Sequence, residues 1–203
     1  MSTADHHDVF AALPAIDDEA RGRLHARLVA AAAEAGILDV AYRTMDTPVG
    51  SLLLAATAQG LVRVAYARED HDAVLGQLAH RVSPRVLRAP ARLDAAAREL
   101  EEYFAGRRSA FDLPLDFRLA QGFRRTVLSH LPDIGYGTTA SYAAVAAAAG
   151  NPRAVRAVGT ACATNPLPVV VPCHRVVRSD GTAGRYVGGT DAKRALLTLE
   201  GAA

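Results

Sequence analysis

The amino-acid sequence predicts an α/β (α+β) protein of two domains, a small sheet-plus-helix domain followed by a mainly helical one. Between residues 40 and 66, apolar residues form short runs and alternate with polar ones, which is typical of β-strands. After residue 118, short helical segments are interrupted by glycine and proline. The 203 residues, 50% of them hydrophobic, supply enough apolar material for both cores. We expect a helical extension at 1–37, the sheet domain at 38–117 and the helical domain at 118–203.

The N-terminal extension has the signals of a single helix. Asp17 or Asp18 can cap its first turn, because aspartate side chains accept hydrogen bonds from the unpaired amides there. Gly36 is expected to end it. At helical spacing, one face of this helix carries the apolar residues Leu24, Leu28, Ala31 and Ala35.

The sheet domain begins with a hairpin pattern. The turn TPVG (47–50) precedes two strand-like runs, SLLLAAT (51–57) and LVRVAYA (61–67). Gly60 lies between the runs and can take the positive φ that a tight turn requires. A helix is expected to follow near 71–81.

A second helix of the sheet domain is expected at 91–104, with Gly106 as its terminator. The sequence from 107 to 118 then predicts an extended linker to the helical domain. The apolar face of the 91–104 helix comprises Leu93, Ala97, Leu100 and Phe104.

The helical domain contains a candidate helix-turn-helix. Ser141 can cap a short alanine-rich helix that Gly150 closes. Asn151 is predicted to cap the next helix, with Pro152 at its first position and its end near Ala163. Two short helices joined by a Gly-Asn turn have the spacing of a helix-turn-helix unit.

Three further segments complete the helical domain. The first helix, within 121–134, is expected to end before Pro132. The apolar run LPVVVPCHRVV (167–177) predicts an extended, strand-like segment. A glycine-rich stretch at 179–189 follows, and a final helix is expected from residue 191 to residue 200.

Composition excludes several classes of protein. The chain has no run of about eighteen apolar residues, so we expect no membrane span. Its first residues lack the basic start and the apolar core of a signal peptide, so a cytoplasmic protein is expected. Two cysteines, Cys162 and Cys173, are too few for a disulfide scaffold or a four-thiolate zinc site, and we expect no metal site.

Charge is distributed unevenly. From Arg118 onward there are ten Lys and Arg residues and four Asp and Glu residues, a net charge of +6. The preceding 117 residues carry 13 basic and 17 acidic ones, a net charge of −4. This asymmetry favours a polyanionic partner for the helical domain, although chance segregation is an alternative.

The adjacent pair Cys173-His174 is a candidate for nucleophilic chemistry. A thiol of ordinary pKa is only about 3% thiolate at pH 7, so a nucleophilic cysteine requires a nearby base. Adjacent side chains on an extended segment diverge, so either direct contact with His174 or a bridging water is possible. Glu200 is the candidate third group that would fix the histidine tautomer. The alternative is a cysteine that serves as a small buried hydrophobe.

The motif PCHRV, with an asparagine eight residues before its cysteine, closely resembles the active-site signature of the O6-alkylguanine-DNA alkyltransferase family. The similar strings TPVGSLLLAAT, YFAG, LPLDFR, SYAAVAAAAGNPRAVRAVG and GRYVGG follow in the family's order, and the resemblance covers about residues 40–201. It implies a ribonuclease-H-like N-terminal domain and a winged-helix C-terminal domain. It also implies direct-reversal repair, in which an alkyl group passes irreversibly from O6-alkylguanine, or less readily O4-alkylthymine, to Cys173 without a cofactor.

The resemblance assigns the other groups of the reaction. Asn165 matches an asparagine that hydrogen-bonds near the thiolate, although Asn-Pro is also a plain turn former. Tyr142 matches a tyrosine that donates a proton toward guanine N3, with a core tyrosine as the alternative. Arg156 matches an arginine that fills the gap left by a flipped nucleotide, although a lone arginine can also contact phosphate.

The family's DNA-binding mode implies a slim helix in the minor groove of double-stranded DNA. Ala154, Ala157, Val158 and Ala161 suit this mode, because a major-groove reader needs longer polar side chains. Some of these residues must instead pack the helix pair. We expect a monomer, and cooperative loading along DNA is possible.

The pocket around the flipped base is also implied by resemblance. Backbone groups of Cys173, Val176 and Val187 would recognise the guanine edge. Gly188 would leave room for adducts as large as benzyl, or serve only a tight turn. Further lining residues are Pro168, Cys162 and Tyr186. Cys162 is expected to pack as an apolar residue, and a resting disulfide with Cys173 is the alternative.

Other functions remain open at this point. A non-repairing protein of the same fold would bind alkyl damage without transferring the alkyl group. A transcription factor would read an operator sequence on undamaged DNA, whereas a repair protein must accept any flanking sequence. A cysteine hydrolase would turn over ester substrates, which permanent alkylation of Cys173 does not allow.

Overall fold

The computed structural model describes residues 17–202. The chain separates into two compact units, residues 1–37 and residues 38–203. In the first, α1 (Asp18–Glu34) begins as predicted, because the Asp17 side chain accepts a hydrogen bond from the amide of Ala20 at 2.6 Å. Leu24 and Leu28, on the predicted apolar face, are both about half exposed (53% and 54%). At 17 residues α1 is the longest helix described, and no described helix is long and apolar enough to cross a membrane.

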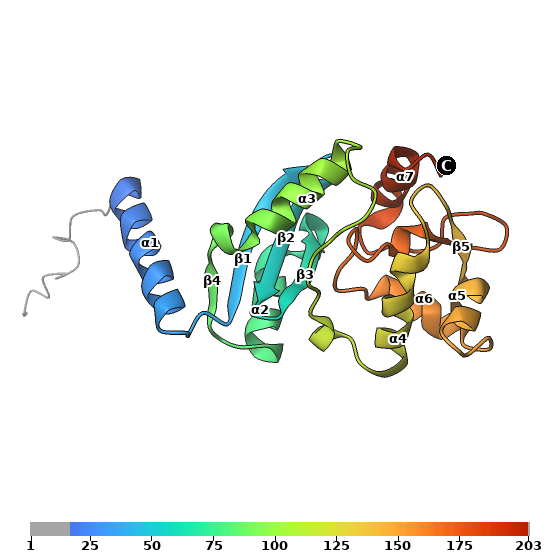
Figure 1. The fold of residues 1–203 in the computed structure, drawn as a ribbon, viewed down its shortest axis with the longest axis horizontal. Helices are drawn as coiled ribbons and strands as arrows, with labels where there is room; N and C mark the ends of the chain where they lie inside the picture. The colour runs from blue at the N-terminus through green and yellow to red at the C-terminus, as the bar shows by residue number, and fades with distance from the viewer. Residues whose placement is uncertain (1–16, 203) are drawn as a thin grey trace, which may run out of the picture. The chain divides into compact units, whose positions relative to one another are not determined.

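The second unit opens with a four-stranded sheet in the order β3-β2-β1-β4 (Figure 1). β2 and β3 form the predicted antiparallel hairpin, β1 pairs antiparallel to β2, and β4 pairs parallel to β1. Gly60 turns the chain into β3 with a φ of 139°. The strands are β1 (Val40–Thr47), β2 (Gly50–Thr57), β3 (Gly60–Tyr66) and β4 (Val86–Arg88).

Two helices cover the sheet, as the sequence predicts. α2 spans His71–Arg81, and its Val74 and Leu78 pack with Leu53 of β2 in one buried cluster. α3 (Asp94–Phe104) lies across the sheet and ends before Gly106, and the predicted start at 91 is a 3₁₀ turn (Pro90–Leu93). Leu52 and Leu54 of β2 point away from Leu53 and are also fully buried. Both faces of the sheet are therefore covered.

The segment predicted as a crossing linker also extends the sheet. Leu61 of β3 donates its amide to the carbonyl of Pro114 at 2.8 Å, and Asp116 donates to the carbonyl of Leu61 at 2.8 Å. A Cβ at Gly60 would collide with the Pro114 carbonyl, so glycine is required there for close approach as well as for its φ. The linker is thus fastened to the free edge of β3 before it reaches the helical part.

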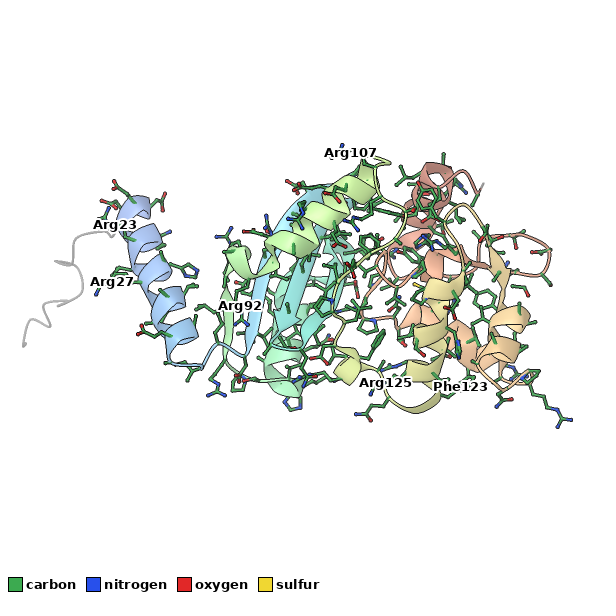
Figure 2. All side chains as sticks on the ribbon, viewed as in Figure 1. Arg23, Arg27, Arg92, Arg107, Phe123 and Arg125 are labelled. Carbon is green, nitrogen blue, oxygen red and sulfur yellow. The ribbon has the colours of Figure 1, made fainter. Side chains whose placement is uncertain are left out.

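The helical part contains α4 (Gly122–His130), α5 (Tyr142–Ala148), α6 (Val155–Ala163) and α7 (Gly189–Leu199). Ser141 caps α5 as predicted, accepting from the amide of Ala144 at 3.1 Å. α4 ends before Pro132, also as predicted, and its Arg125 points outward (Figure 2). α7 begins two residues before its predicted start and ends one residue before its predicted end.

The predicted cap of α6 is wrong. α6 begins at Val155 with Ala154 at its N-cap, so Asn151 is not the cap and Pro152 is not its first helical residue. Instead, the carbonyl of Asn151 accepts from the amide of Ala154 at 2.9 Å, which closes a separate turn. This extra turn lengthens the connection between α5 and α6.

The segment 167–177 is not the predicted strand. The amide of Val171 donates to the carbonyl of Leu167 at 2.8 Å, and Val169 has a φ of 72°. Cys173–Arg175 is a 3₁₀ turn, and only β6 (Val176–Val177) pairs, in parallel, with β5 (Ala140–Ser141). The physical reason is proline: three prolines from 166 to 172 have no N–H to give to a ladder.

Candidate active site

Cys173 lies at the start of the 3₁₀ turn, 1% exposed, and Asn165 holds it. The Asn165 Nδ2 group donates to the Cys173 Sγ at 3.1 Å and to the carbonyl of Val171 at 2.9 Å. Its Oδ1 accepts from the amide of Leu167 at 2.9 Å. The structure thus brings Asn165 and Cys173 together as expected, and one wholly buried amide ties both ends of the irregular segment.

The Cys173 thiol is protonated at rest. Burial raises its pKa to about 11, because a thiolate is poorly solvated there, while the hydrogen bond from Asn165 and the charge of Lys193 act in the opposite direction. The thiol therefore has to lose its proton during any nucleophilic reaction.

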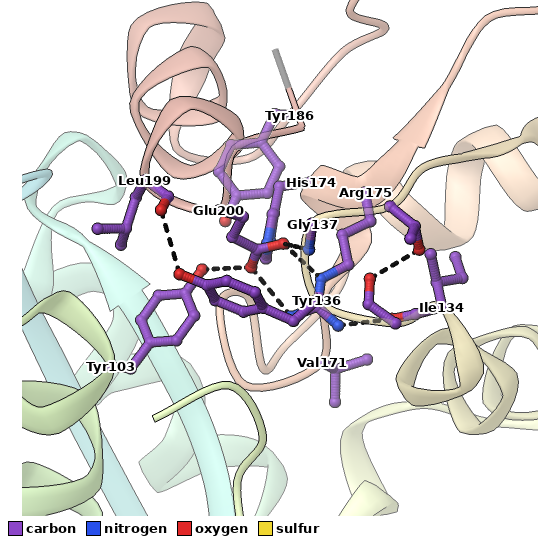
Figure 3. A network of polar contacts seen from close by, with 12 residues as sticks. Tyr103, Ile134, Tyr136, Gly137, Val171, His174, Arg175, Tyr186, Leu199 and Glu200 are labelled. Carbon is purple, nitrogen blue, oxygen red and sulfur yellow. Dashed lines mark hydrogen bonds and ion pairs between the residues drawn. The ribbon is translucent and has the colours of Figure 1, made fainter. Parts of the chain in front are cut away.

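His174 and Glu200 form the predicted pair. Nε2 of His174 lies 2.9 Å from Oε1 of Glu200, and both residues are buried (Figure 3). Burial favours the neutral acid of Glu200, but hydrogen bonds from His174 and Arg175 outweigh it and lower the pKa of Glu200 to about 2. Burial also lowers the pKa of His174, against the pull of Glu200.

These pKa directions assign the tautomer of His174. An ionised carboxylate only accepts hydrogen bonds, so the neutral imidazole must carry its proton on Nε2. Nδ1 is then an unprotonated acceptor. This nitrogen is buried and has no hydrogen-bond partner among the described residues. His174 therefore has the form of a general base.

Glu200 is the centre of a larger polar network at the end of α7 (Figure 3). Arg175 donates Nε to Oε2 at 2.8 Å and a second nitrogen to Oε1 at 2.9 Å. Tyr103, from α3 of the sheet part, donates its hydroxyl to Oε1 at 2.6 Å. The amide of Gly137 donates to Oε2 at 3.4 Å. The Glu200 carboxylate is thus held by hydrogen bonds from both the sheet part and the helical part of the second unit.

Lys193 is a residue of the site that the sequence reasoning missed. It is fully buried, and its Nζ donates to the carbonyl of Val176 at 2.6 Å. Burial lowers the pKa of Lys193, and its positive charge lowers that of Cys173. The sequence held one signal for this residue: Lys193 is the only lysine of the chain, which otherwise uses arginine at its 22 other Lys or Arg positions.

The glycine-rich loop, residues 179–189, contacts His174 through Tyr186. Tyr186 is buried, with its hydroxyl 3.0 Å from that of Tyr66 and its ring edge-on to His174 (6.2 Å between centroids). Val187 is half-buried. A Cβ at Gly188 would lie 2.5 Å from the Tyr66 ring. The expectation that Gly188 leaves open room is wrong, because Tyr66 of β3 fills that space.

The other expected pocket residues are also buried or half-buried. Tyr142, the first residue of α5, packs so closely on Gly184 that a Cβ there would collide with its hydroxyl. Burial raises the pKa of Tyr142, and charge on Cys162 or Cys173 would raise it further. Pro168 is buried. Cys162 and Cys173 are both free thiols, and burial raises the pKa of Cys162.

Helix α6 divides its small residues between two faces. Arg156 and Ala157 are exposed, and Ala154 is half-buried at the N-cap. Val158 and Ala161 are fully buried and pack inside the helical part, so they do not form an outer surface. Among residues 17–202, no three His, Cys, Asp or Glu side chains are grouped to hold a metal ion.

Two family models match the second unit. Residues 40–117 match the ribonuclease-like domain of 6-O-methylguanine DNA methyltransferase, and residues 122–202 match its DNA-binding domain. A constitutive methylated-DNA–protein-cysteine methyltransferase of Bacillus subtilis is 38% identical, over 78% of this chain and 94% of its own. A relative of the same name from Methanosarcina barkeri is 36% identical, over 78% of this chain and 96% of its own.

Solved structures agree with this match. The Mycobacterium tuberculosis O6-methylguanine methyltransferase is 37% identical, with a TM-score of 0.70 over 80% of this chain and 93% of its own. A complex of the Mycobacterium tuberculosis protein with DNA also has a TM-score of 0.70 at 37% identity, over 79% of this chain and 92% of its own. The chain belongs to the 6-O-methylguanine DNA methyltransferase family.

Proposed function

We propose that the protein repairs alkylated DNA by transferring the alkyl group from O6 of guanine to Sγ of Cys173. The observation that carries the proposal is a buried thiol, held by Asn165, next in sequence to a neutral histidine whose Nδ1 is unpartnered. The chain's family and its relatives' names agree with this reaction. O4-alkylthymine would be a slower substrate of the same site.

The proton of the thiol has a route to His174. No hydrogen bond joins Cys173 directly to His174 among those of the described residues, so a water between Sγ and Nδ1 is the proposed carrier. Glu200 accepts a hydrogen bond from the Nε2–H group of His174, which keeps Nδ1 unprotonated for this transfer. Lys193 would stabilise the thiolate as it forms, because its charge lowers the pKa of Cys173.

The transfer itself is a displacement at the alkyl carbon. The new S–C bond forms as the C–O6 bond breaks, and the electron pair of that bond passes to guanine. Tyr142 would donate a proton to the departing guanine at N3, while His174 holds the thiol proton. The thioether is stable, so each molecule reacts once and needs no cofactor.

The target base must come to the thiol. Cys173 is 1% exposed, so a base stacked in a duplex cannot meet its Sγ. We propose that α6 enters the minor groove and that exposed Arg156 takes the place of the flipped nucleotide. Every group of the relay comes from one chain, which supports action as a monomer. Thiol chemistry at Cys173 also favours the reducing cytoplasm as its compartment.

Mass spectrometry of the intact protein tests this proposal. After incubation with a duplex that contains O6-methylguanine, we expect each molecule to gain one methylene. Cys173→Ala should gain none, whereas Cys162→Ala, a matched change at the other buried thiol, should still react. Binding of the duplex without any gain in mass would contradict transfer and would favour a protein that only recognises damage.

A further inference from the structure

Tyr103 connects the sheet part of the molecule to the polar network at Cys173. It lies in the last turn of α3 and is fully buried. Its hydroxyl donates to Oε1 of Glu200 at 2.6 Å, across 97 residues of sequence. Figure 3 shows the ring reaching from the sheet part toward the carboxylate that His174 and Arg175 also contact.

The hydroxyl shares its acceptor atom with the proposed base. Oε1 of Glu200 accepts from Tyr103, from Nε2 of His174 at 2.9 Å and from Arg175 at 2.9 Å. Hydrogen bonds to one oxygen compete for its electron density. A donor at Oε1 therefore weakens the attraction of that oxygen for the proton on His174.

Packing fixes the direction of the hydroxyl. The Tyr103 ring lies 5.4 Å from the Phe104 ring, 5.3 Å from the Phe111 ring and 6.2 Å from the Tyr136 ring, centroid to centroid. A phenylalanine could make all of these ring contacts. The hydroxyl therefore adds nothing to the aromatic packing, and within residues 17–202 its hydrogen-bond partner is Glu200.

We propose that Tyr103 is a positioning residue for alkyl transfer, whose hydroxyl holds Oε1 of Glu200 in place and keeps His174 neutral and ready to accept a proton. This inference rests on the function proposed above. It makes the sheet part a contributor to the chemical step as well as a scaffold.

The sign of the effect follows from charge. Without the hydroxyl, the Glu200 charge at Oε1 is shared by fewer donors and attracts an imidazolium more strongly, so His174 takes up a proton at higher pH. The other groups facing the pair would be unchanged: Arg175 and Lys193 oppose protonation of His174, while burial raises the pKa values of Tyr186 and Cys173 and keeps both neutral. Protonated His174 cannot act as the base.

The test is the pH dependence of the single-turnover rate with an O6-methylguanine duplex. For Tyr103→Phe we expect the acid limb of the profile to move to higher pH by about half a unit or more, the scale of one altered hydrogen bond to a charged group. Tyr136→Phe is the matched control, because its hydroxyl donates to the carbonyl of Leu199 and not to Glu200. Its profile should keep the wild-type midpoint.

A second variant covers the case in which Tyr103→Phe does not fold. Site-specific 3,5-difluorotyrosine at position 103 keeps the ring and makes the hydroxyl a stronger donor, so the acid limb should move to lower pH. A uniform loss of rate with an unchanged midpoint in these variants would reduce Tyr103 to a structural residue and overturn the proposal. Failure of the wild type to gain a methylene would instead overturn the proposed function.

Discussion

The sheet and the Cys173 segment of this protein are held together by different forces. In the sheet, paired strands satisfy the backbone and a fully buried leucine row, Leu52 to Leu54, fills both faces. In residues 165–177, prolines interrupt the ladder, and side chains of Asn165, Lys193 and Glu200 bind the chain. Stability thus comes from regular apolar packing, while reactivity depends on a few buried polar groups. Changes to each region should have separable consequences.

The largest separation is expected between Asn165→Leu and Leu53→Ala. Asn165→Leu removes the donor to Sγ, leaves the amide of Leu167 unpaired and takes away one of the two donors to the carbonyl of Val171, whose other donor is the amide of Cys173. We expect the transfer rate of the folded protein to fall by about 100-fold or more, as for loss of a preorganised donor. The free energy of unfolding should fall by about 2 to 4 kcal/mol.

Leu53→Ala is the counterpart in the sheet. It should lower the free energy of unfolding by about 2 to 5 kcal/mol through a core cavity, with little change in rate per folded molecule. Denaturant unfolding and rapid-quench kinetics measure the two quantities. A large rate loss in Leu53→Ala would break the contrast between the regions.

The next effect concerns acid stability. The folded-state pKa of Glu200, about 2, is below its ordinary value of 4.5. Its contribution is therefore complete above pH 4.5 and is lost as the pH falls toward 2. The lost stability should amount to about 3 kcal/mol. Between pH 4.5 and pH 2, the free energy of unfolding of the wild type should fall more steeply with decreasing pH than that of Glu200→Gln. Equal slopes of unfolding free energy against pH in the two proteins would contradict the low pKa of Glu200.

A smaller effect is expected for Lys193→Met, which replaces a buried charge by an apolar side chain of similar length. The Cys173 pKa should rise, because a nearby positive charge no longer favours the thiolate. The transfer rate at neutral pH should fall by about tenfold, and raising the pH should recover part of it. Arg194→Met on the exposed side of α7 is the matched control. An equal loss at every pH would point to misfolding.

The smallest effect concerns adduct size. Because the Tyr66 ring occupies the space beside Gly188, Tyr66→Ala should increase the rate with O6-benzylguanine relative to O6-methylguanine by about fivefold. Arg43→Ala, on β1, which β2 separates from β3, serves as the control. A benzyl-to-methyl ratio that is unchanged in Tyr66→Ala would show that Tyr66 does not limit the pocket.

Local patterns predicted most regular elements but not the irregular ones. The hairpins and α2 follow from alternation and turn residues. The α6 cap was misplaced because Asn151 and Pro152 have cap chemistry, yet the chain inserts another turn before Val155. The run 167–177 is apolar like a strand, and only its prolines signal otherwise.

The candidate site was predicted in part. The motif pointed to Cys173, His174 and Asn165, and the need for a group to fix the histidine tautomer pointed to Glu200; the structure brings Asn165 to Cys173 and Glu200 to His174. Tyr66 and Tyr103 were not named, because their contacts cross from one part of the fold to the other and leave no trace in local spacing. Long-range polar contacts of this kind require the three-dimensional structure.

The most direct test of the account is the stoichiometry of repair. With a large excess of O6-methylguanine duplex, we predict that the number of guanines restored equals the number of protein molecules. Peptide mapping should then find the methyl group on Cys173 alone. Restoration of many guanines per molecule, or a methyl group on another residue, would contradict the claim that Cys173 is a reagent consumed in one reaction.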